Sequence, residues 1–142
     1  MPQALVSIVV AMRRVNHPHE ACALLFGHVT RGGSGPVIEV KAVREIENLV
    51  RSPVAFEIDP VVQYQMMEEE KARDPPRSLV GILHTHPGNQ FVSGTDVKYM
   101  KNAARLSTLL WLIAGDGKRG ELDIGAYIVD GGKVREIPLV YT

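Results

Sequence analysis

The stretch GILHTHPGNQFVSGTD, residues 81–96, begins in an apolar run and ends at the start of a predicted helix. The apolar residues over 78–86 predict a strand that lies inside a sheet covered on both faces. This strand ends on His84 and His86, and Asp96 follows shortly after. In α/β sheets, ligands collect beyond the carboxyl ends of strands. The three side chains therefore either gather around a metal or form only a strand end, a turn and a helix cap.

The other elements follow from hydrophobic spacing, turn residues and helix-start signals. Apolar residues recur at helical spacing from Leu5 to Met12, and Asp59-Pro60 is a strong helix start. The predicted helices span 3–16, 60 to about 73, and 94–105; the predicted strands span 21–29, 37–46, 54–58, 78–86, 107–115, 122–130 and 133–141. Helices that alternate with apolar strands predict an α/β fold, a mixed sheet sandwiched between helices, as one domain over residues 1–142.

Length and composition restrict the class of protein. Of the 142 residues, 45% are hydrophobic and 23% charged, which is typical of a soluble globular domain. Sixteen Lys and Arg balance sixteen Asp and Glu, so no net charge favours nucleic acid or an acidic membrane. The N-terminal apolar stretch is too short to span a membrane and lacks the features of a signal peptide. The only cysteine, Cys22, excludes an internal disulfide and suggests a reducing, cytoplasmic setting.

The His-x-His spacing has a direct geometric consequence. Residues i and i+2 of a strand project to the same side of a sheet, so His84 and His86 can aim both imidazoles at one point. Asp96, in the first turn of the next helix, can reach the same point. Two imidazoles and one carboxylate suit zinc, and three protein ligands leave a fourth position open, as in catalytic zinc sites.

A purely structural interpretation fits each piece taken separately. Ser93 and Asp96 have the spacing of a capping box, and the helix dipole alone favours an acidic residue at this position. Histidines at strand ends can be ordinary hydrogen-bonded residues, and short motifs often match by accident. The acidic run at 68–70 is interpreted as the exposed face of the second helix, and Cys22 as a buried, inert thiol.

Other classes of metal site are disfavoured. No histidine follows His86, which argues against hydrolases that need several downstream histidines. The lactamase-like pattern requires Asp and His where the chain has Gly88 and Asn89. The zinc deaminases require a Cys-x-x-Cys pair, which one cysteine cannot supply. Among metal sites, a single zinc held by two histidines and one aspartate remains.

These residues also resemble a known family. His84-Thr85-His86-Pro87 followed by Ser93-x-x-Asp96 resembles the signature of the JAMM, or MPN-plus, metalloproteases. The segment from Glu20 to Gly27 is similar to the family's Glu-x-x-Gly-Leu-x-x-Gly segment. Asp59-Pro60 also recurs in family members, including the proteasome-lid deubiquitinase. The resemblance extends over approximately residues 3–139.

The resemblance implies a fold and a ligand set. The fold would be a three-layer α/β/α MPN domain, which is cytidine-deaminase-like and has a central mixed sheet. His84, His86 and Asp96 would bind one Zn²⁺ per chain, with a water in the fourth position.

The resemblance also implies the catalytic roles. Glu20 would be the general base, and the Ser93 hydroxyl would stabilise the oxyanion of the tetrahedral intermediate. The residues alone leave Glu57 and the glutamates at 68–70 open as alternative bases.

The implied activity is that of a deubiquitinase-like, zinc-dependent isopeptidase, which hydrolyses the amide between the C-terminus of ubiquitin or a ubiquitin-like modifier and a lysine. The modifier's tail would lie along residues 51–58, where Val54 and Phe56 are the candidate substrate-binding residues, because β-addition needs an unpaired edge. Two alternatives stay open: a relative that processes a sulfur-carrier or small-modifier protein, and a non-catalytic MPN scaffold. An MPN-domain dimer or a proteasome-type assembly is a possible setting, whereas no nucleic-acid or membrane partner is expected.

Overall fold

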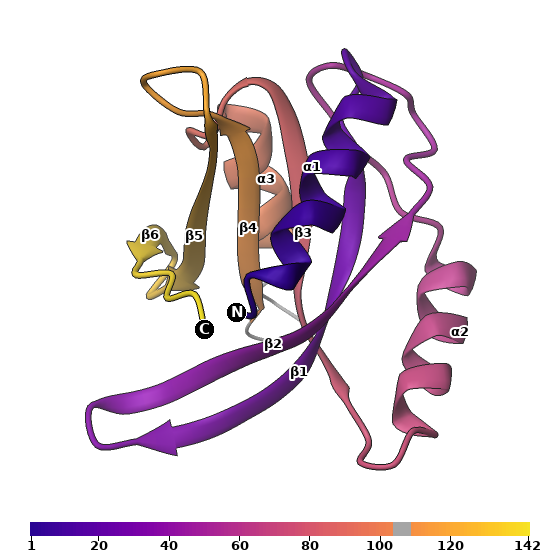
Figure 1. Ribbon diagram of the computed structural model, residues 1–142, viewed down its shortest axis with the longest axis vertical. Coiled ribbons are helices and arrows are strands. Elements are labelled where there is room, and N and C mark those ends of the chain that lie inside the picture. The colour runs from indigo at the N-terminus through magenta and orange to yellow at the C-terminus, as the bar shows by residue number, and fades with distance from the viewer. Residues whose placement is uncertain (104–108) are drawn as a thin grey trace.

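The structure is a computed structural model and describes residues 1–103 and 109–142. Its elements appear in Figure 1 and run along the chain as α1 (Ala4–Asn16), β1 (Cys22–Gly32), β2 (Gly35–Ile46), α2 (Pro60–Lys71), β3 (Ser78–Asn89), α3 (Gly94–Ala103), β4 (Leu110–Asp116), β5 (Leu122–Asp130) and β6 (Lys133–Ile137). Within these described residues, no helix is long and apolar enough to cross a bilayer.

The strands form one mixed sheet in the order β2-β1-β3-β4-β5-β6. β3 and β4 run parallel, with α3 between them in the chain, and every other neighbouring pair is antiparallel. α1 covers one face of the sheet, and α2 and α3 pack on the other (Figure 1). The predicted fold class, a three-layer α/β/α domain with a central mixed sheet, is therefore confirmed.

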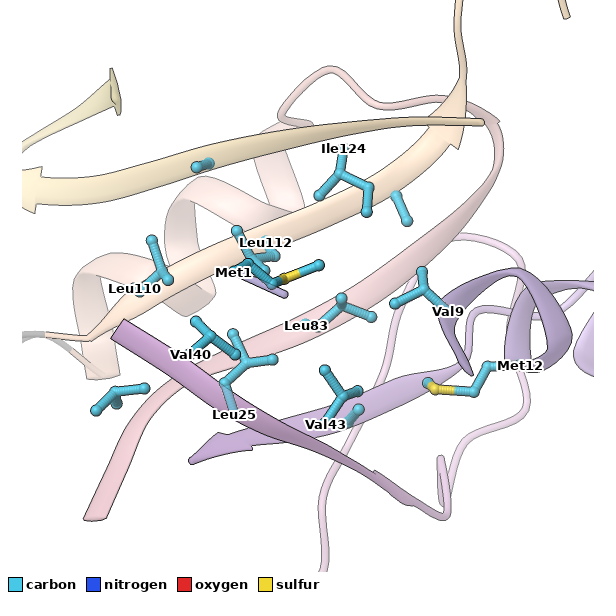
Figure 2. Close-up of a cluster of buried hydrophobic side chains, with 14 of the residues drawn as sticks. Met1, Val9, Met12, Leu25, Val40, Val43, Leu83, Leu110, Leu112 and Ile124 are labelled. Carbon is cyan, nitrogen blue, oxygen red and sulfur yellow. The ribbon is translucent and has the colours of Figure 1, made fainter. Parts of the chain in front are cut away.

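The core under α1 explains why the central strands are so apolar. Val9 and Met12 of α1 belong to one buried cluster with Leu25, Leu83 and Leu112, one from each of three adjacent strands (Figure 2). Alternate residues of the same strands point to the opposite face, where they pack with side chains of α2 and α3. Strands buried on both faces need apolar residues at nearly every position, which is the pattern that the sequence shows.

Most predicted elements are confirmed, with changes at their ends. α1 ends at Asn16, where the chain turns ahead of Pro18, and the Asp59 side chain caps α2 by accepting the Val61 N–H at 2.8 Å. β3 continues three residues beyond His86, and β6 ends at 137 although a strand to 141 was predicted. The predicted ends at 105 and 107 lie outside the described residues.

The strand predicted over 54–58 is wrong, because this segment joins no sheet. Its backbone bonds to the preceding loop: the Leu49 N–H donates to the Glu57 carbonyl at 3.0 Å, and Asn48 bonds both Ala55 and Glu57. Phe56 and Ile58 are nevertheless buried. An extended loop that packs over a core buries alternate residues just as a strand does, which explains the misleading pattern.

The acidic run on α2 is not uniformly exposed, and this prediction is corrected at one residue. Glu70 is buried, and its carboxylate lies 3.5 Å from Arg44 and 3.6 Å from both Arg73 and Arg77. Its neighbour Glu69 remains exposed and pairs with Arg44 at 2.6 Å. The arginines come from β2 and from the residues that follow α2, so Glu70 fixes the end of this helix against the sheet.

Candidate metal centre

The two histidines lie in β3, at the end of the part of this strand that is buried. His84 is 1% exposed and His86 9%, and both rings lie on the same face of the sheet. Thr85, between them, accepts the Ala21 N–H on its hydroxyl at 2.9 Å, and its own N–H donates to the Ala21 carbonyl. The segment that leads into β1 is thereby held beside the histidine pair.

The Asp96 carboxylate lies against both of these histidine rings. The two Nε2 atoms lie 3.2 Å apart. Asp96 Oδ1 is 3.0 Å from His84 Nε2, and Asp96 Oδ2 is 3.1 Å from His86 Nε2. Asp96 is 3% exposed in the first turn of α3, although helices rarely bury a carboxylate without a partner.

The capping box predicted at the start of α3 is also present. The Asp96 N–H donates to Ser93 Oγ at 3.1 Å, and the Ser93 N–H donates to Asp96 Oδ2 at 2.9 Å. The structural and the metal-site interpretations of this motif are therefore compatible, because the cap orients the carboxylate that meets the histidines. Ser93 itself is exposed beside the centre.

Glu20 is the fourth acidic or imidazole group at this point. One ligand atom from each of Glu20, His84, His86 and Asp96 lies within 4.8 Å of the others. Burial raises the pKa of Glu20 to about 7, with the His86 ring acting against this shift and the Asp96 charge adding to it. A carboxyl group with a pKa near the working pH can both take up and release a proton. The alternative base Glu57 is exposed, and Glu70 is engaged with arginines.

The protonation of the ring nitrogens follows from their partners. Burial lowers the pKa of His84, against the pull of Asp96. Burial would also lower the pKa of His86, but hydrogen bonds with Asp96 and the Asn89 carbonyl outweigh it. Because His86 Nδ1 faces that carbonyl at 2.9 Å and a carbonyl only accepts, Nδ1 carries a proton. A metal at the centre would take the place of the proton that Nε2 shares with Asp96 and would bind the lone pair of this nitrogen.

The carboxylate of Asp96 is ionised throughout the physiological range. Burial alone would raise its pKa, but the hydrogen bonds from His84 and His86 hold the pKa far below its ordinary value. The centre therefore offers one negatively charged carboxylate and two imidazole rings, which are ligand types that bind zinc.

The spacing of these atoms fits a zinc ion. Ligand atoms bonded to a tetrahedral zinc at about 2.0–2.1 Å lie about 3.3 Å from one another. Here the two Nε2 atoms lie 3.2 Å apart, and each lies 3.0 or 3.1 Å from a different oxygen of Asp96. In the described part of the chain, Glu20 Oε1 is also buried without a hydrogen-bond partner. An unsatisfied carboxylate oxygen beside three ligand atoms is expected where an ion, its water and a substrate bind.

The last residues of β3, after His86, are fixed from α1 by a residue that the sequence did not single out. Arg13 donates to the carbonyls of residues 86, 87 and 88 at 2.9, 2.9 and 3.3 Å, and pairs with Asp116 at 2.9 Å. On the other side, this end of β3 packs against Gly115. A Cβ atom added to this glycine would lie only 2.5 Å from the Asn89 backbone, so the close approach needs glycine. An arginine in the last turn of a helix gives no specific signal in a sequence.

Phe56 and Val54, the predicted substrate-binding residues, have different surroundings. Phe56 is buried and stacks on the His84 ring, with centroids 4.7 Å apart and planes inclined by 25°. Val54 is 68% exposed. Phe56 therefore supports a ring of the centre, and the substrate role of this segment stays a prediction.

Cys22 is fully buried, and burial raises the pKa of its thiol to about 12, with the charges of Glu45 and Glu20 adding to the shift. A thiol with this pKa is protonated and inert.

The fold and these side chains define an α/β protein with a candidate metal centre at the end of a central strand and a buried carboxyl group beside it. The model of the prokaryotic homologs of the JAB domain matches residues 2–124. The chain belongs to this family, which confirms the resemblance to the JAMM/MPN proteins.

Two individual proteins are similar to the chain. A desampylase from the archaeon Pyrococcus furiosus is 33% identical over 123 residues, which cover 85% of this chain and 75% of that protein. The solution structure of a protein from Desulfitobacterium hafniense superposes with a TM-score of 0.78, covering 99% of this chain and 90% of the other. At 24% identity, this second likeness bears on the fold alone.

Proposed function

We propose that the protein is a zinc-dependent isopeptidase, which releases a small ubiquitin-like modifier from a lysine. The observation that carries this proposal is the buried group of Glu20, His84, His86 and Asp96 at the end of β3. The scaffold alternative is disfavoured because all three candidate ligands are present and clustered. The relative's name, desampylase, favours conjugates of a small modifier protein as the substrate.

The residues of the chain would divide the work as follows. His84, His86 and Asp96 would hold the zinc, which when bound lowers the pKa of water to near 7 and polarises a carbonyl. Glu20 would take a proton from the attacking water and give it to the lysine nitrogen as the C–N bond breaks. The pKa of about 7 suits both transfers. The products are a free carboxylate on the modifier and a free lysine amine.

Ser93 would stabilise the charge that develops on the carbonyl oxygen. Its oxygen already accepts the Asp96 N–H, which fixes the position of the oxygen without using its hydrogen. The hydroxyl can therefore donate to an oxyanion from a position fixed before the reaction begins.

Two measurements test the proposal. The first is the zinc content of the purified protein after zinc loading and desalting, beside a His84→Ala/Asp96→Ala variant. The second is cleavage of a ubiquitin-like modifier whose C-terminal glycine is joined to the lysine of a fluorescent peptide, with Glu20→Gln as the control. We expect one zinc per chain and cleavage only by the unaltered protein. Absence of zinc from the unaltered protein, or equal cleavage by Glu20→Gln, would overturn the proposal.

A further inference from the structure

Glu20 occupies its position without a regular element to hold it. It lies just ahead of β1, and both of its backbone groups bond to the loop that follows β2. The Glu20 N–H donates to the Ser52 carbonyl at 2.7 Å, and the Glu20 carbonyl accepts the Asn48 side-chain N–H at 2.8 Å. Since the carboxylate Oε1 has no hydrogen-bond partner in the part of the chain that the structure describes, these two backbone bonds contribute strongly to the position of the residue.

Asn48 uses the full hydrogen-bonding capacity of its side chain. The residue is buried, and its amide nitrogen donates to the carbonyls of Glu20 and Ala55 at 2.8 and 3.1 Å. Its amide oxygen accepts the N–H groups of Val50 and Glu57 at 3.2 and 3.0 Å. The four hydrogen bonds of this one side chain, two donated and two accepted, therefore join Glu20 to both ends of the loop at residues 49–57.

The same loop also contacts a candidate zinc ligand. Phe56 stacks on the His84 ring from this loop, and it contacts Tyr99 with centroids 4.6 Å apart. Asn48 thus fixes a loop that holds the backbone of Glu20 on one side and the ring of His84 on the other. A loop with this position can set the distance between the carboxyl group and the metal centre.

We infer that Asn48 is a positioning residue, which places the Glu20 carboxyl group against the metal centre through the loop at residues 49–57. This inference rests on the proposed function, because it takes Glu20 as the general base. A base must lie within hydrogen-bond reach of the proton that it takes. A displacement of about 1 Å can reduce the rate of such a step about 100-fold.

Asn48→Asp separates this role from simple support of the fold. The aspartate keeps an oxygen for the Val50 and Glu57 N–H groups but cannot donate to Glu20 or Ala55. Asn48→Ser, which retains one hydroxyl donor, is measured beside it in case the aspartate variant does not fold. Glu70→Gln is the matched control, because it disturbs a buried polar residue of α2 that does not contact Glu20.

The experiment measures zinc content, kcat and KM on the fluorescent modifier conjugate, and amide hydrogen exchange, at a temperature where every variant is folded. For Asn48→Asp we expect one zinc per chain, a KM within about twofold, a kcat reduced about 10- to 100-fold, and faster exchange at the Glu20 amide. Glu70→Gln should keep the kcat of the unaltered protein. A kcat that is unchanged in Asn48→Asp, or reduced equally in Glu70→Gln, would overturn the inference.

The exchange measurement separates failure of the inference from failure of the proposed function. If the zinc-loaded, unaltered protein cleaves no conjugate, the proposed function fails. Exchange at the Glu20 amide, which donates to the Ser52 carbonyl, still reports on whether Asn48 holds this loop against Glu20. Unchanged exchange at the Glu20 amide in Asn48→Asp would then show that Asn48 does not hold this residue.

Discussion

Phe56→Leu tests whether aromatic stacking supports the candidate zinc ligand His84. The His84 ring has no hydrogen-bond partner at Nδ1 in the described residues, whereas His86 has the Asn89 carbonyl. Metal-binding histidines usually gain their orientation from a bond at the second nitrogen. Here the stacked Phe56 ring, with its centroid 4.7 Å from that of the His84 ring, would orient His84 in place of such a bond. Leucine keeps an apolar side chain at this position but removes the stacked ring.

The expected magnitude follows from the two aromatic contacts that are lost. Each pair of this kind contributes about 0.5–1.5 kcal/mol beyond the area that it buries. If the contact with His84 is lost, zinc affinity should fall by this amount, or about 2- to 12-fold. Loss of the Tyr99 contact and of part of the ring's volume should lower the free energy of unfolding by a further ~1–2 kcal/mol.

The assay is competition for zinc between the protein and a fluorescent chelator, combined with denaturant unfolding of the zinc-free protein. Phe26→Leu is the control, because Phe26 is fully buried on the same face of the sheet and has no aromatic contact with His84. It should lose stability but keep its zinc affinity. Equal zinc affinities in Phe56→Leu, Phe26→Leu and the unaltered protein would refute the reasoning.

Three further changes have distinct expected results. Ser93→Ala should keep zinc but reduce kcat about 100- to 1,000-fold, measured on the modifier conjugate, because an oxyanion donor is lost; a kcat within threefold would contradict this. Glu70→Ala should lower the free energy of unfolding by about 1–3 kcal/mol in denaturant titration, because Arg44 and Arg77 lose a buried partner; an unchanged midpoint would refute it. The pKa of Glu20 is about 7 in the folded protein and about 4.5 as its ordinary value, so its contribution to stability is present below pH 4.5 and is lost as the pH rises through 7. The free energy of unfolding of the zinc-free protein should therefore be lower at pH 8 than at pH 5, and Glu20 should account for ~3 kcal/mol of this difference at most. Glu20→Gln should lack this part of the difference; an equal pH dependence in both proteins would contradict the prediction.

The sequence predicted those parts of the molecule that local chemistry determines. The central strands are apolar because both faces are buried, and α2 begins where Asp59 can cap and Pro60 fits the first turn. The His-x-His spacing placed two rings on one side of β3, because strand geometry leaves no other arrangement. In each case the residues that decide the structure lie within a few positions of one another.

The parts that the sequence did not predict depend on contacts between distant residues. Glu70 resembles its exposed neighbours in the acidic run, and only Arg44 and Arg77, from other parts of the chain, make its burial possible. The segment around Phe56 alternates between buried and exposed positions like a strand, but its partners are the Asn48 side chain and the His84 ring. Glu20 could not be chosen over other glutamates from the residues alone, because the fold brings it to the centre.

The relation between the cap and the metal centre explains why one short motif supported two interpretations. Each Asp96 oxygen faces a different histidine, Oδ1 towards His84 and Oδ2 towards His86, and Oδ2 also accepts the Ser93 N–H. A carboxylate free to rotate would lose conformational entropy on binding a metal, whereas the cap has fixed this one as part of folding. The hydrogen bond that begins α3 therefore also orients the third candidate ligand. For Asp96, capping a helix and facing two histidines are thus compatible roles, and the cap is not an alternative to a metal site.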